Sequence, residues 1–377
     1  MGEDVRLGDL LPREPRGDGA RRVAEGRVKG GLRGLLSRYK VPLIAAKIVL
    51  SFALFAYVVA KVSPGDIWDT IRPADERYLL AAAGLFLLSN LIGSWIWARL
   101  LRAQGVPIPY RKAASYYFVG LFFNNFLPSN IGGDITRISD AAKHADHVSP
   151  VFSATVMDRL VGVLAMALVA VLASFAAIDR IHLYAIYMAI VITFVVSLGL
   201  FLSIFNRSVL KAFEWPFRVI GARTIERGIR RLMDDLHGYK QQGKVLRLVF
   251  AASVVVQVSR ILVHYLVGLA LGVRVAVGYY FLFVPALAAL VSLPISLNGL
   301  GIREGAGVVL FHMAGMTKEQ AFTVPFLTYL ISVCISLLGG LIFVSRTPRR
   351  ALKGILEKRR TARAAAAAGG RARKGID

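Results

Sequence analysis

The chain has 377 residues and a mass of 41.1 kDa, with 56% hydrophobic residues, 19% charged residues and a mean hydropathy of +0.57. Soluble domains are nearer to a quarter charged, so this composition excludes an ordinary soluble enzyme and an intrinsically disordered chain. The formal net charge of +24 alone is typical of nucleic-acid binding, but the apolar excess indicates a membrane protein first. The single cysteine, Cys334, excludes an internal disulfide framework and a cysteine-rich metal site.

The apolar residues form clusters of membrane length, because a hydrocarbon core of about 30 Å needs roughly 20 helical residues. A polar, arginine-rich stretch precedes the first cluster, so we expect a signal-anchor helix rather than a cleavable signal peptide. In chain order, spans are predicted at Leu43–Ala60, Tyr78–Trp97, Val151–Ile178, Leu183–Phe205, Val245–Leu271 and Ala321–Val344. Two further apolar stretches, Ala113–Leu127 and Tyr279–Leu297, end in motifs rich in Pro, Gly and Asn and differ from ordinary spans.

The distribution of charge predicts the topology. Four segments have net charges between +4 and +9, namely residues 1–40, 99–112, 206–247 and 346–377. The other connections have net charges between −1 and +1, namely residues 61–77, 179–182, 272–278 and 316–320. Because cytoplasmic loops collect Lys and Arg, we expect the basic segments and both termini to be cytoplasmic. The predicted location is the plasma or inner membrane, crossed several times.

This topology divides the chain into a basic N-terminal tail, residues 1–40, a transmembrane domain, residues 41–345, and a basic, disordered C-terminal tail, residues 346–377. Within the domain, residues 206–243 show apolar residues at helical spacing between charged ones, which predicts an amphipathic helix along the inner leaflet. Basic segments of this kind attract anionic lipid headgroups at the cytoplasmic face.

The same charge pattern requires two segments to return to the side from which they start. Region 113–150 starts and ends on the cytoplasmic side, and region 279–316 starts and ends outside. We therefore predict an all-α polytopic integral membrane protein with about six full spans and two opposed re-entrant hairpins.

The two re-entrant regions have similar sequences. Residues 127–137 read LPSNIGGDITR, and residues 293–304 read LPISLNGLGIRE. Matched Pro and Gly breaks in opposed segments predict an inverted repeat with a binding site near the bilayer midplane. Proline ends the first half-helix, glycines permit close backbone approach, and the restarted helix offers free N–H groups to an anion. The alternative is that these residues only kink tightly packed helices.

Charged residues inside apolar segments are costly and are usually functional. Asp158 and Arg159 lie inside one span, and Arg260 and His264 share one helical face of another. The alternative for Arg159 and Arg260 is a buried ion pair or snorkelling to the interface. The predicted substrate-binding residues are Asn130, Gly132, Gly133, Asp134, Arg137, Asp158, Arg159, Asn298, Gly299, Gly301, Arg303 and Glu304. The arginines among them would bind phosphate, and the carboxylates would balance the arginines or carry a coupling proton.

Three motifs, in order, resemble the signature of the flippase-like, lysylphosphatidylglycerol-synthase transmembrane family: Phe126–Arg137, Met157–Gly162 and Leu293–Gly305. The resemblance covers roughly residues 40–345. It implies a module that moves charged lipids between leaflets. The soluble aminoacyltransferase domain of the two-part synthases has no counterpart after the last span, so the resemblance does not imply synthase activity.

We therefore expect a translocator for a phosphate-bearing lipid, with no enzymatic activity, no cofactor and no metal. The chain lacks the HExxH, Walker A, CxxC and nucleophile-elbow motifs. One alternative is a membrane-embedded lipid-modifying enzyme, for which His144, Asp146 and His147 lie close together but without recognisable ligand spacing. Another is a non-catalytic partner of a lipid-synthesis enzyme. Nucleic acid is not an expected partner, because the cytoplasmic bias of basic residues already explains the net charge.

Overall fold

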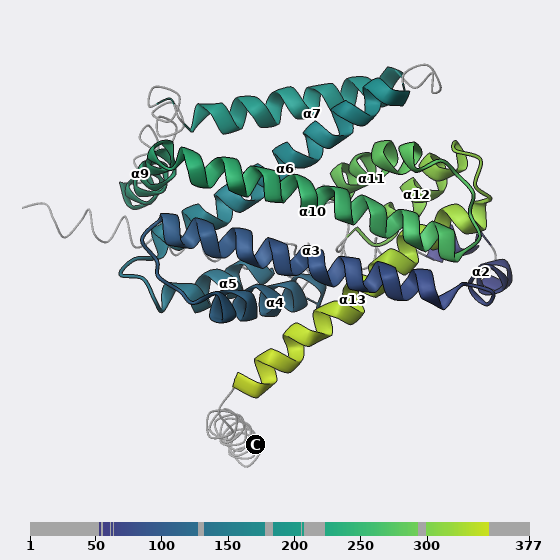
Figure 1. The fold of residues 1–377 in the computed structure, drawn as a ribbon, viewed down its shortest axis with the longest axis horizontal. Helices are drawn as coiled ribbons and strands as arrows, with labels where there is room; N and C mark the ends of the chain where they lie inside the picture. Colours follow the sequence, from purple (N-terminus) through teal and green to yellow (C-terminus); the bar gives the residue numbers. More distant parts are fainter. Residues whose placement is uncertain are drawn as a thin grey trace, which may run out of the picture. The chain divides into compact units, whose positions relative to one another are not determined.

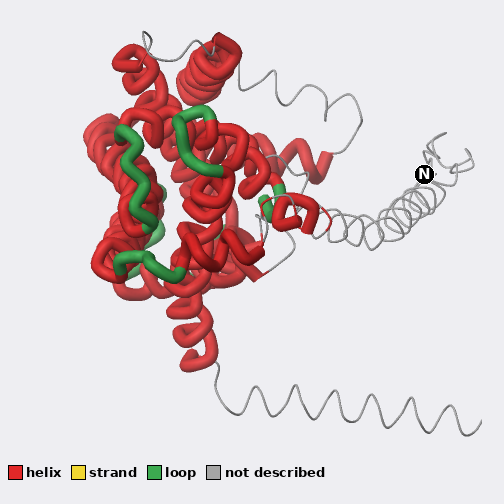
Figure 2. The backbone as a smooth tube through the Cα atoms, turned by 90° about the vertical axis from the view of Figure 1, so that its right-hand side faces the viewer, coloured by secondary structure: helices red, strands yellow, loops and turns green. Residues whose placement is uncertain are grey.

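The computed structural model describes residues 53, 56–60, 62, 64–126, 132–177, 184–204, 206, 223–292 and 299–346. These parts of the chain contain helices and loops and no strand, as predicted for an all-α protein (Figure 2). The helices labelled in Figure 1 are α2 (Pro64–Ile71), α3 (Glu76–Ala103), α4 (Tyr110–Phe126), α5 (Gly132–Ala142), α6 (Val148–Ala177), α7 (Tyr184–Ser203), α9 (Arg223–Gly238), α10 (Gly243–Ala270), α11 (Val277–Ser292), α12 (Ile302–His312) and α13 (Lys318–Arg346). A short 3-10 helix, η1 (Tyr239–Gln241), lies between α9 and α10 in the chain.

Four of the described helices, α3, α6, α10 and α13, are long and apolar enough to cross a membrane. They coincide with the predicted spans at 78–97, 151–178, 245–271 and 321–344 and are candidates for crossing the membrane. The apolar part of α7, Ile190–Ser203, is shorter. The predicted span at 43–60 lies mostly outside the described residues. A multi-pass helical membrane protein is therefore confirmed, and the number of spans stays a prediction.

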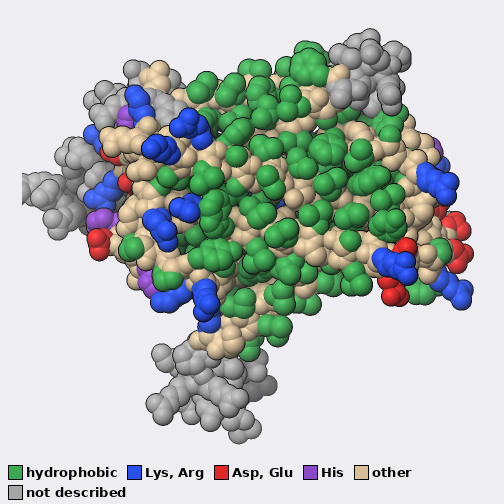
Figure 3. Space-filling view, viewed as in Figure 1, with side chains coloured by type: hydrophobic (Ala, Val, Ile, Leu, Met, Phe, Trp, Pro, Cys, Tyr) green, Lys and Arg blue, Asp and Glu red, His purple; other side chains and the backbone are tan. Residues whose placement is uncertain are grey.

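The surface has the polarity that a bilayer requires. Hydrophobic side chains cover the middle of the face in Figure 3, over α3, α7 and α10. Lys and Arg gather at the end where α10 begins, and acidic side chains, mixed with Lys and Arg, lie at the opposite end, beside α2 (Figure 3). Apolar residues such as Leu80, Leu172 and Val195 are 60–72% exposed. An apolar band between two polar ends suits a protein surrounded by lipid tails.

The long helices α3 and α10 lie antiparallel to each other (Figure 1). At one end, the Asp75 N–H donates to the Ala270 carbonyl oxygen over 2.9 Å. At the other end, the Tyr239 hydroxyl donates to the Leu100 carbonyl oxygen over 3.0 Å. The loops that follow α3 and α10 therefore leave from opposite ends of this helix pair.

Each of these loops leads into a helical hairpin. In the first, α4 and α5 pack so closely that a Cβ on Gly120 would lie 2.8 Å from the Gly133 carbonyl oxygen. In the second, the ring of Phe311 on α12 lies 5.4 Å from that of Tyr280 and 5.9 Å from that of Phe283, both on α11. Because they follow opposite ends of the α3–α10 pair, the two hairpins enter the bundle from opposite ends.

The two series of helices have matched lengths. The helices α3, α4, α5 and α6 have 28, 17, 11 and 30 residues, and α10, α11, α12 and α13 have 28, 16, 11 and 29. The second series begins 167 residues after the first, Gly243 against Glu76, and its last helix begins 170 residues after its counterpart, Lys318 against Val148. The packing also corresponds, since α4 packs against α13 and α11 packs against α6.

Two clusters of buried side chains hold these elements together. One surrounds Trp97 and Met157 and includes residues of the first hairpin. Its buried indole is satisfied, because Trp97 Nε1 donates to Thr155 Oγ1 over 3.1 Å. The other surrounds Tyr280 and Phe311 of the second hairpin. Each hairpin is thus packed on its own core.

The predicted amphipathic segment at 206–243 is described in part. Residues 223–238 form α9, where Leu236 is buried and Asp235 accepts a hydrogen bond from the Ser149 hydroxyl of α6. Residues 207–222, the predicted tail 1–40 and all of the predicted tail 346–377 except Arg346, which ends α13, lie outside the described residues.

Candidate functional site

A cavity of about 580 Å³ lies among α3, α4, α5, α6, α10 and α11. We call it the central cavity. Its walls combine apolar residues and glycines with a set of polar and charged side chains, namely Tyr117, Asn124, Asp134, Arg137, Asp158, Arg159, Ser253, Gln257, Arg260, His264 and Ser292. These polar residues come from two parts of the sequence, 117–159 and 253–292, which are more than 90 residues apart, so only the fold brings them together.

The first motif builds one wall of the central cavity through the start of α5. The Gly133 N–H donates to Asn124 Oδ1 over 2.8 Å, which satisfies one of the unpaired N–H groups at the start of this helix. The Thr136 hydroxyl donates back to the Gly133 carbonyl oxygen, also over 2.8 Å. A Cβ on Gly133 would collide with the Gly120 carbonyl oxygen, so the close contact of α4 and α5 requires glycine here.

Four charged residues on α5 and α6 form one continuous network. Arg137 Nε lies 3.1 Å from Asp134 Oδ1, and Arg137 Nη1 and Nη2 both donate to Asp158 Oδ2 over 3.1 Å. Arg159 Nε donates to Asp134 Oδ2 over 2.6 Å. The positive charges of the two arginines balance the negative charges of the two aspartates, so the network is neutral overall. Arg137, Asp134 and Asp158 are mostly buried, whereas the Arg159 side chain is 54% exposed.

The aromatic neighbours of Arg137 fix its position further. The guanidinium carbon lies 5.1 Å from the ring centroid of Trp97 and 5.3 Å from that of Tyr117. Cation–π contacts of this kind favour a desolvated guanidinium. Arg137 is thus held by the carboxylates of Asp134 and Asp158 and by the aromatic rings of Trp97 and Tyr117.

The helix α10 supplies the opposite wall of the central cavity. Gln257 Nε2 donates to the Gly162 carbonyl oxygen of α6 over 2.9 Å, and His264 Nδ1 donates to the Arg260 carbonyl oxygen over 3.0 Å. Among the described residues, no carboxylate forms an ion pair with Arg260. The cavity therefore has three arginines and two aspartates in its walls, and Arg260 is the cation in excess.

The second motif forms a separate cluster at the start of α12. Gly299 and Gly301 have φ angles of +77° and +81°, which L side chains rarely adopt. The Gly301 N–H donates to Glu304 Oε2 over 2.7 Å, and Arg303 Nη1 lies 3.8 Å from Glu304 Oε1. Arg303 also lies 3.9 Å above the ring of Tyr329 on α13. These residues do not line the central cavity.

The structure therefore separates the predicted site residues into three groups. Asp134, Arg137, Asp158 and Arg159 meet in the central cavity, while Gly132 and Gly133 form the first turn of α5. The residues of the second motif are at a distance from this network, at the start of α12: Gly299, Gly301, Arg303 and Glu304. Asn130 and Asn298 lie outside the described residues.

Sequence reasoning left several cavity residues out of the site. Arg260 and His264 share one helical face in the sequence, but no sequence feature indicates that this face lies opposite Asp158. Gln257, one turn before Arg260, was an available signal, because it adds a third polar residue to the same face of an apolar helix. Tyr117 and Asn124 carried no recognisable signal. In the described parts of the chain, no group of three His, Cys, Asp or Glu side chains is arranged to hold a metal ion.

Comparison with known proteins agrees with this architecture. A UPF0104 membrane protein of Pyrococcus horikoshii is 23% identical over 330 residues, which cover 81% of this chain and 96% of that protein. A UPF0104 membrane protein of Methanothermobacter thermautotrophicus is 25% identical over 307 residues, which cover 76% of this chain and 90% of that protein. No solved structure matches the chain.

The family model described as "Lysylphosphatidylglycerol synthase TM region" matches residues 44–340. That range includes every helix that lines the central cavity and both hairpins. The chain therefore belongs to the family of the lysylphosphatidylglycerol synthase transmembrane region.

Proposed function

We propose that this protein moves a phosphate-bearing lipid between leaflets, with the headgroup in the central cavity and the acyl chains in the bilayer. The observation that carries this proposal is Arg260. It is a guanidinium in the wall of a cavity among membrane-length helices, where it has no carboxylate partner among the described residues. A charge at this depth is costly unless it is compensated, and an anionic ligand would compensate it.

The ion network provides a second phosphate contact through Arg159. Asp134 forms an ion pair with Arg137 and accepts a hydrogen bond from Arg159, so Arg159 can exchange this carboxylate for a phosphate while Arg137 keeps both aspartates. Arg159 is also the most exposed member of the network. Arg159 of α6 and Arg260 of α10 would then hold the phosphate from two walls, with the bidentate geometry that guanidinium groups give. Arg137 would position Asp134 and Asp158 rather than touch the lipid.

The matched helix series support a transport architecture. We interpret α3–α6 and α10–α13 as an inverted repeat, with α4–α5 and α11–α12 as re-entrant hairpins from opposite faces. The basic end of the bundle, where α10 begins, would be cytoplasmic, with both termini on that side of the plasma or inner membrane. Rocking of one series against the other would expose the central cavity to each leaflet in turn.

Transport is testable in liposomes made from the purified protein and a fluorescent phosphatidylglycerol. Wild type should move the label between leaflets, as measured by the fraction that an impermeant quencher reaches. Arg260→Gln should lose most of this movement, and Arg102→Gln, an exposed arginine at the end of α3, should keep it.

Three results would contradict the proposal. The first is equal movement in wild type and Arg260→Gln. The second is a change in the mass of the lipid after incubation with wild type, which would favour the lipid-modifying enzyme. The third is a wild-type protein that binds lipid but moves none, which would favour a partner of a lipid-synthesis enzyme.

A further inference from the structure

A second cavity of about 760 Å³ lies between α6, α7 and the start of α10. We call it the α7 groove. Its apolar wall is formed by Leu164 of α6, Leu198, Phe201 and Leu202 of α7, and Leu246 and Phe250 of α10. None of these residues lines the central cavity, so the two cavities are distinct.

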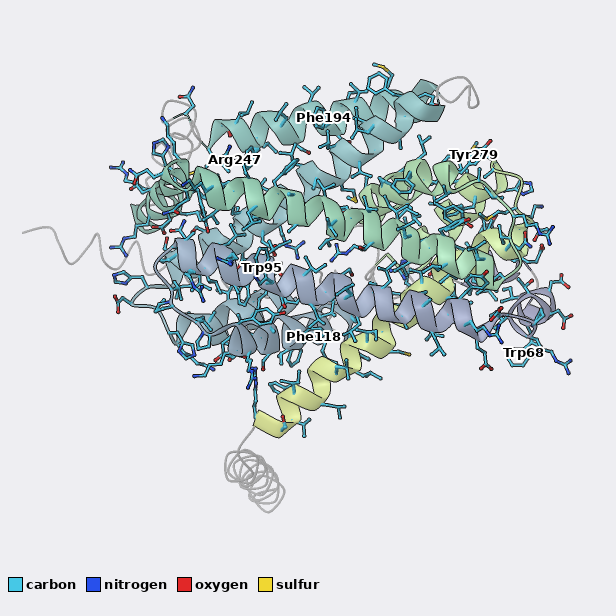
Figure 4. All side chains as sticks on the ribbon, viewed as in Figure 1. Trp68, Trp95, Phe118, Phe194, Arg247 and Tyr279 are labelled. Atoms are coloured by element: carbon cyan, nitrogen blue, oxygen red, sulfur yellow. The ribbon has the colours of Figure 1, made fainter. Side chains whose placement is uncertain are left out.

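One edge of the α7 groove is basic. Lys240, Lys244 and Arg247 line it and are exposed, and no acidic residue of the described parts of the chain lines the groove. None of the three forms an ion pair within the described parts of the chain. Figure 4 shows Arg247 on α10, between the ribbons of α10 and α7. The edge therefore presents three uncompensated cations beside an apolar wall.

The backbone adds to this edge. Gly243 and Lys244 are the first residues of α10, and no side chain caps the helix there. Their N–H groups have no acceptor within the helix, and a helix start favours negative charge. The side-chain amides of Gln241 and Gln242 also line the groove and provide further donors.

We infer that the α7 groove binds an anionic phospholipid, with an acyl chain along the apolar wall and the phosphate at Lys240, Lys244 and Arg247. Basic pockets between helices at the cytoplasmic side are typical sites for acidic phospholipid headgroups. The volume lies within the usual range of ligand sites, which is roughly 300–1,000 Å³. Because α7 packs against α6, a lipid in this position would join α7 to α10. This site does not depend on the proposed transport function.

Native mass spectrometry of the purified protein in a neutral detergent tests this inference. It measures how much added phosphatidylglycerol or phosphatidylcholine the protein retains. Wild type should bind phosphatidylglycerol in preference to phosphatidylcholine. The triple variant Lys240→Gln/Lys244→Gln/Arg247→Gln should bind it about a hundredfold more weakly, because each cation near an anionic lipid surface contributes about fivefold. Lys240→Arg/Lys244→Arg should keep the affinity, since it keeps the charge.

Two matched variants distinguish lipid binding in the α7 groove from lipid binding to any positively charged surface. Arg102→Gln/Arg111→Gln/Lys112→Gln removes three exposed cations outside the groove and should leave phosphatidylglycerol binding unchanged. Leu198→Trp fills the apolar wall without changing charge and should weaken binding.

Three results would overturn the inference: equal binding of the two lipids, equal losses in both charge variants, or unchanged binding in Leu198→Trp.

A photocrosslinker at position 202 should capture added lipid. Capture of residues 207–222 of the same chain instead would show that the protein fills its own groove.

Discussion

At the scale of single residues, the central cavity combines a neutral ion network with one excess cation. Removing one partner of a buried ion pair leaves an uncompensated charge, whereas a half-exposed partner is stabilised by water. The members of the network are thus not equivalent. Asp134 is buried and forms ion pairs with Arg137 and Arg159. The Arg159 side chain, in contrast, is about half exposed.

This difference predicts the stability of two variants. Asp134→Asn should destabilise the protein by about 3–5 kcal/mol, because Arg137 and Arg159 both lose a charged partner. Arg159→Gln should cost less than about 1 kcal/mol, because its side chain is 54% exposed. Thermal unfolding in detergent would measure both. Equal losses would show that Arg159 is a structural residue and not a ligand contact.

Arg159→Gln should nevertheless impair lipid movement. The same liposome assay should show a loss comparable to that of Arg260→Gln, because both residues hold the phosphate in the proposed geometry. Normal transport by a stable Arg159→Gln variant would remove Arg159 from the site.

The glycine contacts give a second prediction at this scale. Gly133→Ala should sharply reduce the folded yield, because the added Cβ would collide with the Gly120 carbonyl oxygen. Gly84→Ala in α3 is the matched control, because nothing lies within 4 Å of a Cβ there and alanine favours a helix. Thermal unfolding and yield of both variants would measure the difference. A stable Gly133→Ala protein would mean that α4 and α5 separate without cost.

At the scale of elements, the two hairpins explain why the apolar stretches at 113–127 and 279–297 did not resemble spans. The helices α4 and α11 have 17 and 16 residues, and each is followed by an 11-residue helix that runs back. The 16 described residues of α11 span about 24 Å, which is less than the hydrocarbon thickness of about 30 Å. In the proposed re-entrant arrangement, these segments would enter the bilayer and return.

Cysteine accessibility tests this return directly, in a Cys334→Ser background because Cys334 is exposed. Lys112→Cys and Lys143→Cys flank the first hairpin, and both should resist an impermeant thiol reagent until the membrane is broken. Arg274→Cys and Lys318→Cys flank the second hairpin, and both should react from outside. Opposite behaviour of the two positions that flank one hairpin would show that this segment crosses the membrane an odd number of times and does not return.

At the scale of the whole molecule, the sequence predicted the helix class, the long helices and the charged residues of the first motif. These features depend on local composition, since apolar length and Pro–Gly breaks are visible without the fold. The second motif illustrates the limit. Its residues matched the first motif in order, yet Arg303 and Glu304 pair with each other at the start of α12, outside the central cavity.

The wall formed by α10 shows the other limit of prediction from sequence. Gln257, Arg260 and His264 are single polar residues on a long apolar helix, and no motif marks them. They line the central cavity because the antiparallel packing of α10 on α3 places this face opposite the ion network. Such pairings between distant helices depend on packing, which a single sequence does not reveal.

The central claim is that a lipid phosphate occupies the central cavity. The most direct measurement is photocrosslinking in membranes, with a phospholipid that has a diazirine beside its phosphate, followed by mapping of the labelled peptides. We predict labels on the cavity faces of α6 and α10, around Arg159 and Arg260, and a strong reduction of both labels in Arg260→Gln. Labels confined to lipid-facing positions such as Leu172 and Val195, and unchanged in Arg260→Gln, would contradict the account.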